Sequence, residues 1–146
     1  MSIFNGCDYS ASTLAEMQDL LSQVDRGSKW EYDDTLSVWH GPGVPFALLR
    51  EMATGKLEPE ARLDLHGLRV AIAEPTVEKF LRTAQQERRR CVLIITGRGD
   101  DSGGVLRESI GEWLKSARST KRVLAFAHAP RVLGGDGATI VLLRRA

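Results

Sequence analysis

Residues 91 to 96 read CVLIIT, an unbroken apolar run, and the glycine-rich phrase GRGDDSGG follows at 97 to 104. A short continuous apolar run is typical of a strand that is buried on both faces of a sheet. Glycines directly after such a run are typical of a loop that leads into a helix. The stretch therefore predicts a central strand, a loop, and a following helix.

The segments on either side of this strand alternate between strand and helix patterns. Residues 63–66 form a short predicted strand, and 70–89 place apolar residues at helical spacing, with Pro75 near the start. A second helical face covers 104–117. Two more strands are expected, at 122–128 and 138–144. The predicted order is β-α-β-α-β-β.

This order predicts an α/β fold with a two-layer sandwich architecture. Two right-handed crossovers and a hairpin-like return give a four-stranded mixed sheet with both helices on one face. The opposite face and the loop ends then stay open to a ligand.

Residues 1–60 differ from the rest and are predicted to form a partly helical N-terminal arm. Leucines and other apolar residues at helical spacing predict a short helix over 10–25. Residues 26–45 show no sustained period and are expected to be extended, with a turn at GPG. The phrase FALLREMAT at 46–54 predicts a helix, and Gly55 is placed to give it a left-handed C-cap.

The formal net charge of +1 combines two halves of opposite sign. Residues 1–60 hold four basic and ten acidic side chains, whereas 61–146 hold 16 basic and nine acidic ones. A basic domain is suited to phosphate backbones, because each neutralised phosphate releases counterions. A solvated basic surface would give the same composition, so charge alone leaves both readings open.

The acidic arm has the wrong sign for direct phosphate binding. We expect it to contact protein or to fold over its own basic domain. Its aromatic residues Trp30, Tyr32 and Trp39 are expected to pack the arm onto that domain, with exposed anchors for a partner as the alternative. Domains are thus predicted at 1–60 and 61–146.

Composition argues against secretion and against a membrane protein. The N-terminus lacks a basic start followed by an apolar segment, and no apolar run approaches the roughly 20 residues that span a bilayer. Only Cys7 and Cys91 occur, without metal-ligand spacing. A cytoplasmic protein with no bound metal is expected.

The phrase LDLHG at 63–67 carries the first candidate for chemistry. Because side chains alternate along a strand, Leu63 and Leu65 are expected on the core side, with Asp64 and His66 together on the other. A carboxylate beside an imidazole can orient it as a general base. An isolated DxH pattern more often reflects only polar residues on the solvent-exposed face of a strand.

Two glycine phrases are the other candidates. ITGRG at 95–99 ends the central strand, where ligands gather in α/β sheets, and Arg98 is suited to a phosphate. It is neither a Walker motif nor a dinucleotide fingerprint. GGDG at 134–137 is an ordinary hairpin connection, or else brings backbone close to a bound strand. His40 and His128 lack ligand-spaced partners and are read as structural, or as auxiliary binders.

Taken in order, ARLDLHG, VLIITGRG, LRESIGEWL, AFAHAP and GGDGATIVLL resemble the Smr (small MutS-related) domain. The resemblance covers about residues 61–145 and is most similar to stand-alone bacterial members with an N-terminal extension. It implies a fold similar to the C-terminal domain of bacterial initiation factor three. It also implies endonuclease activity on DNA or RNA, in one branch on mRNA at collided ribosomes with the extension docked on the ribosome.

The resemblance also assigns site residues. The acid and histidine of the family motif fall on Asp64 and His66, which it implies are catalytic. Many members have histidine before the glycine loop, whereas this chain has Thr96, so a second proton carrier is unidentified. The residues expected to bind substrate are Thr96, Gly97, Arg98, Gly99, Gly135 and Gly137.

The leading hypothesis is a metal-independent endonuclease that acts on RNA, in the cytoplasm and without a membrane partner. Only Asp64, Asp100 and Asp101 lie near the site in sequence, and the last two could recruit Mg²⁺. A non-catalytic module that binds nucleic acid or the ribosome, and a structure-directed DNA nicking enzyme, are the alternatives.

Overall fold

The computed structural model describes residues 30–97, 102–116, 119 and 121–145. The helix predicted over 10–25 and the loop residues Arg98 and Gly99 lie outside this part of the chain.

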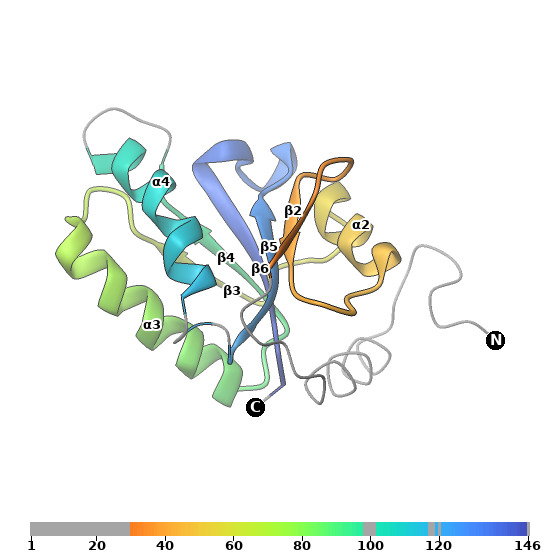
Figure 1. The fold of residues 1–146 in the computed structure, drawn as a ribbon. Coiled ribbons are helices and arrows are strands. Elements are labelled where there is room, and N and C mark those ends of the chain that lie inside the picture. Colours follow the sequence, from red (N-terminus) through yellow and green to blue (C-terminus); the bar gives the residue numbers. More distant parts are fainter. Residues whose placement is uncertain (1–29, 98–101, 117–118, 120, 146) are drawn as a thin grey trace.

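The described chain forms one sheet with helices on both of its faces (Figure 1). The strands are β1 (Glu31–Asp33), β2 (Val38–His40), β3 (Ala61–Asp64), β4 (Cys91–Ile95), β5 (Val123–His128) and β6 (Ala138–Leu143). The helices are α2 (Phe46–Thr54), α3 (Val70–Gln86), α4 (Ser102–Lys115), and the short 3-10 turns η1 (Arg131–Leu133) and η2 (Gly135–Gly137).

The sheet has six strands in the order β1-β2-β5-β6-β4-β3, so the prediction of four strands was wrong. β3 and β4 pair in parallel, and β6 is antiparallel to both of its neighbours, which confirms a mixed sheet. The hairpin of β1 and β2 adds to the free edge of β5, whose backbone groups it satisfies. Each added strand is only three residues long, too short to show an alternating pattern in the sequence.

α3 and α4 cover one face of the sheet together, as predicted, and α2 lies on the other face (Figure 1). Leu48 and Met52 of α2 are fully buried against β-strand residues such as Leu93 and Ile140. The face that was expected to stay open is therefore partly covered by the N-terminal segment. The reason is that β4, β5 and β6 are apolar on both faces and need cover on both.

Local predictions in this segment are confirmed. α2 ends at Gly55, whose φ of 83° is left-handed and whose N–H donates to the Glu51 carbonyl oxygen. Gly43 turns the chain at GPG with φ of 79°. Trp30 packs edge-on against Phe126 with ring centroids 5.5 Å apart, so aromatic packing does join this segment to the sheet.

Several boundaries differ from expectation. β3 spans Ala61–Asp64 and not 63–66. α3 begins at Val70 as expected, with Pro75 inside it, but ends at Gln86 and not at 89. α4 begins at Ser102, before the predicted 104. In the described part of the chain, no helix combines the length and apolarity that crossing a membrane requires.

Candidate active site at the carboxyl ends of β3 and β4

β3 and the residues after it divide between core and solvent as the alternation predicts. Leu65 is fully buried and Leu63 packs partly against the core below α3 and α4. Asp64 and His66 point the other way, with side chains 55% and 74% exposed. The acid and the imidazole therefore stand together at the surface.

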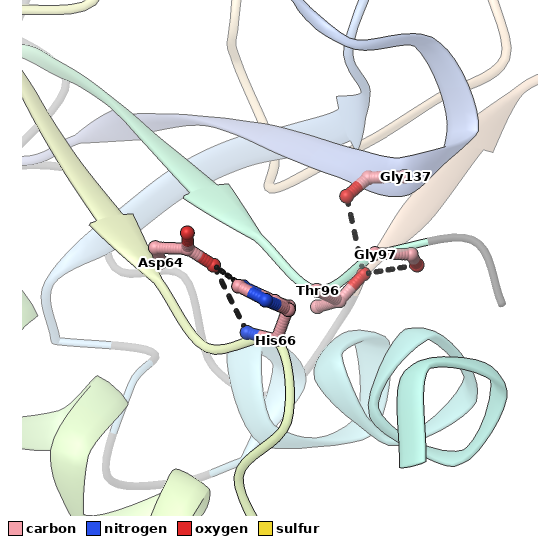
Figure 2. A network of polar contacts seen from close by, with 5 residues as sticks. All are labelled: Asp64, His66, Thr96, Gly97 and Gly137. Atoms are coloured by element: carbon pink, nitrogen blue, oxygen red, sulfur yellow. Dashed lines mark hydrogen bonds and ion pairs between the residues drawn. The ribbon is translucent and has the colours of Figure 1, made fainter. Parts of the chain in front are cut away.

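A single carboxylate oxygen holds His66 in two ways (Figure 2). Asp64 Oδ1 accepts the backbone N–H of His66 at 3.0 Å. It also lies 2.9 Å from His66 Nδ1, which donates to it. With its proton on Nδ1, a neutral imidazole keeps the lone pair of Nε2 for a substrate proton.

The same contacts set the charge of Asp64. The backbone hydrogen bond from His66, and then its side-chain hydrogen bond, hold the pKa of the Asp64 carboxyl below its usual 3.8. The group thus stays a carboxylate at any pH near neutrality, as an orienting partner for imidazole must.

The parallel pairing of β3 and β4 brings the two motifs together. The Leu65 N–H donates to the Ile95 carbonyl oxygen at 2.7 Å, extending the ladder past the end of β3. A Cβ on Gly97 would lie 3.5 Å from the Cβ of His66. Gly97 has φ of 85°, a left-handed conformation that favours glycine, so the loop turns directly beside the imidazole.

Thr96 faces inward. It is fully buried, and its hydroxyl donates to the carbonyl oxygens of Gly97 at 3.2 Å and Gly137 at 3.4 Å (Figure 2). In this geometry it fixes the loop, and a direct contact with substrate stays a prediction.

The Gly137 carbonyl oxygen ties the third motif to the second. It accepts the backbone N–H groups of both Thr96 and Gly97 at 3.0 Å. Because these two amides already donate hydrogen bonds, an anion would have to accept hydrogen bonds from amides further along the loop. Gly135, in the same 3-10 turn, has φ of 62°.

The structure thus gathers Asp64, His66, Thr96, Gly97 and Gly137 at one end of the sheet, where β3 and β4 stop and β6 begins. Gly135 lies in the adjoining turn. Arg98 and Gly99 lie outside the described residues, and their roles stay predictions. Arg62 was missed. It is exposed and lies two residues before Asp64 on the same side of edge strand β3, a position that the alternation in ARLDLHG could have indicated.

Among the residues that the structure describes, no three His, Cys, Asp or Glu side chains gather. Cys91 is free and buried, and desolvation, with a smaller contribution from Glu60, raises the pKa of its thiol to about 12. It is therefore part of the core and a poor nucleophile.

Comparison with known sequences identifies a family and relatives. The family model of the Smr domain matches residues 63–144. The ribosome rescue factor SmrB of Shewanella sp. (strain ANA-3) is 30% identical over 105 residues, which cover 72% of this chain and 56% of that protein. SmrB of Shewanella baltica (strain OS155) matches to the same extent. The match thus spans little more than half the length of these relatives.

Solved structures of Smr proteins are also similar to this chain. The chain is similar to YdaL, a stand-alone small MutS-related protein from Escherichia coli, with a TM-score of 0.64, 27% identity, and coverage of 84% of this chain and 98% of that one. The Smr domain of Thermus thermophilus MutS2 gives a TM-score of 0.51 and 39% identity over 57% of this chain and 98% of that domain. With the family model and these relatives in agreement, this chain belongs to the Smr domain family.

Proposed function

We propose that this protein is an endonuclease that cleaves RNA, with His66 as the general base. The observation that carries the proposal is the pair of hydrogen bonds from His66 to Asp64 Oδ1, which direct His66 Nε2 away from the carboxylate. Membership of the Smr domain family supports a nucleic-acid substrate, and the basic charge of residues 61–146 suits one.

In the proposed reaction, His66 Nε2 removes the proton from a ribose 2′-hydroxyl. The 2′-oxygen then bonds to the adjacent phosphorus while the bond to the 5′-oxygen breaks. This leaves a 2′,3′-cyclic phosphate and a 5′-hydroxyl. Because the Thr96 hydroxyl is buried and donates to carbonyl oxygens, we assign the proton that the 5′-oxygen takes up to solvent.

The negative charge that develops on the scissile phosphate must be stabilised by hydrogen-bond donors near the imidazole. Arg98 and the loop amides after Gly97 are proposed to supply them, since the amides of Thr96 and Gly97 already donate to Gly137. Arg62, exposed on the Asp64 side of β3, is a second cation suited to the RNA backbone.

Relatives named as ribosome rescue factors point to a setting for this reaction. We propose that the substrate is mRNA on a stalled ribosome, in the cytoplasm, with the ribosome contacted through the N-terminal segment. Ribosome pelleting of the full chain, with and without residues 1–29, tests that part separately from cleavage.

The test of the chemistry compares the wild type with Asp64→Ala and His66→Ala on labelled single-stranded RNA and on supercoiled DNA. We expect RNA cleavage with a 2′,3′-cyclic phosphate end. Loss of the base should slow cleavage by roughly a hundred- to ten-thousand-fold. Circular dichroism should be unchanged, because both side chains are exposed.

Other outcomes of this panel identify the alternatives. Equal binding by all three proteins without any cleavage would identify a non-catalytic binding module. Nicked DNA excludes attack by a 2′-hydroxyl and indicates a DNA nicking enzyme. Activity abolished by EDTA and restored by Mg²⁺ would overturn the metal-independent reaction.

A further inference from the structure

A cavity of about 180 Å³ lies away from Asp64 and His66, between α4, the β1–β2 hairpin and strands β5 and β6. This volume is below the roughly 300–1,000 Å³ of pockets that take drug-sized ligands, so it suits one planar ring system. We call it the hairpin pocket. Nothing in the proposed reaction uses it.

One wall of the hairpin pocket is aromatic. Tyr32 and Trp39 line it, with ring centroids 4.9 Å apart and planes tilted by 52°. Lys115 Nζ lies 4.1 Å from the centroid of the Trp39 ring and engages that ring. Tyr32 is 45% exposed, which makes its ring the available surface for stacking.

The rest of the lining offers both donors and acceptors. Arg107 and Glu108 contribute from α4, and Thr139 contributes from β6. A phosphate group would meet the Glu108 carboxylate and be repelled by it. A nucleobase has a flat face for stacking and both donor and acceptor edges, so it matches this lining.

Gly111 leaves volume free in the hairpin pocket but makes α4 less stable than alanine would. It lies inside α4, where glycine is less favourable than alanine. A Cβ there would approach Phe126 Cε2 only to 3.8 Å, an ordinary contact. Alanine would therefore fit and favour the helix, but its methyl group would occupy part of the pocket.

The hairpin pocket is joined to the candidate active site through β6. Thr139 of the pocket lies two residues after Gly137, whose carbonyl oxygen holds the backbone of Thr96 and Gly97. Thr139 also pairs with Ile94 of β4, and the next β4 residue, Ile95, pairs with Asp64. At about 4.8 Å between strands, the backbones of Asp64 and Thr139 are on the order of 10 Å apart. Asp64 faces away from α3 and α4 whereas Thr139 faces α4, so one RNA strand would reach both sites by passing over the end of the sheet where β3 and β4 stop and β6 begins.

We propose that the hairpin pocket binds one base of the single-stranded RNA, stacked on Tyr32, and so positions the strand for cleavage. The proposal rests on RNA being the substrate, as proposed above.

The experiment measures binding of the full chain to short single-stranded RNAs that carry one abasic nucleotide at each position in turn. To keep the RNA intact, binding is measured by fluorescence anisotropy with His66→Ala, and cleavage is measured in parallel with the wild-type histidine. One abasic position should weaken binding by about tenfold, because a stacked base is lost. Adding Tyr32→Ala should weaken binding of intact RNA by a similar factor and abolish the sensitivity to that position.

Gly111→Ala separates the pocket from the fold. It should raise the melting temperature while weakening binding of intact RNA several-fold. Ser109→Ala, also in α4 but outside the pocket lining, is the matched control. It should likewise raise the melting temperature and leave RNA affinity unchanged.

The proposal is overturned if Tyr32→Ala keeps the position-specific sensitivity, or if Gly111→Ala binds RNA as tightly as Ser109→Ala does. Failure of the cleavage proposal looks different. RNA that stays uncut by the wild type, yet shows the abasic effect and its loss in Tyr32→Ala, would overturn cleavage and support the base site.

Discussion

The two edges of the six-stranded sheet are built in different ways. At the β3 edge, Asp64 and His66 make their contacts with each other, two residues apart, and both are exposed. At the other edge, β1 and β2 join β5, and the hairpin pocket there draws side chains from α4, β5 and β6 as well. A local contact can be read from the sequence, whereas a pocket of this second kind depends on the whole fold.

The two edges also contribute differently to stability, since the segment that adds β1 and β2 supplies core residues and the candidate catalytic pair does not. Leu48→Ala in α2 should lower the free energy of unfolding by about 2–5 kcal/mol, because it leaves a cavity at a fully buried position. Urea denaturation measures this. Ile72→Ala, at a position 56% exposed, is the control and should change stability little. Equal effects would mean that the N-terminal segment is not part of the core.

Gly97→Ala tests how strictly the β3 edge depends on backbone geometry. Its φ of 85° is left-handed, so alanine there should cost about 1–2 kcal/mol. Cleavage should fall as well, since Gly97 lies beside His66. Gly67→Ala is a matched control at φ of 82° with no atom within 4 Å of its added Cβ. A similar loss of stability without the loss of cleavage is expected there, measured by thermal melting and RNA cleavage.

At the opposite edge, the contact between Lys115 and Trp39 gives a smaller effect. Lys115→Met keeps most of the aliphatic chain and removes the charge above the ring. We expect a loss of about 0.5–1 kcal/mol, typical of a cation–π contact, measured by urea denaturation. Because Lys115 also lies 3.7 Å from Glu112, Glu112→Gln is the control for loss of that ion pair. If Lys115→Met leaves stability unchanged, the contact does not hold the hairpin to α4.

The smallest expected change is in the pKa of the Asp64 carboxyl, at the β3 edge. His66 lowers the pKa of Asp64 first through its backbone N–H and then through its side chain. In His66→Ala the backbone hydrogen bond is kept, so the pKa should rise only part of the way towards 3.8. NMR titration of the Asp64 carboxyl in the two proteins measures this. A return all the way to 3.8 would mean that the imidazole alone sets the shift.

The sign of the corresponding pH dependence follows from the lowered pKa. Asp64 contributes stability that is fully present above its unfolded value of 3.8 and is lost as the pH falls through the lower folded value. The contribution is small, because the side chain is 55% exposed and solvent screens it.

Much of the domain was predictable because its signals are local. The apolar run at 91–96 predicted β4, helical spacing predicted α3 and α4, and Gly55 after FALLREMAT predicted the end of α2. The alternation in LDLHG predicted that Asp64 and His66 would share the exposed side. The order of two crossovers and a return also predicted a mixed sheet with α3 and α4 on one face.

The sequence by itself thus determined the elements of residues 61–145 and the Asp64–His66 pair, because backbone propensity and contacts two residues apart depend on neighbouring residues. Only the tertiary structure decided that β1 and β2 extend the sheet, that α2 covers its second face, and that Thr96 turns inward to Gly137. Three-residue strands carry no period, and the direction of a hydroxyl depends on a carbonyl 41 residues away.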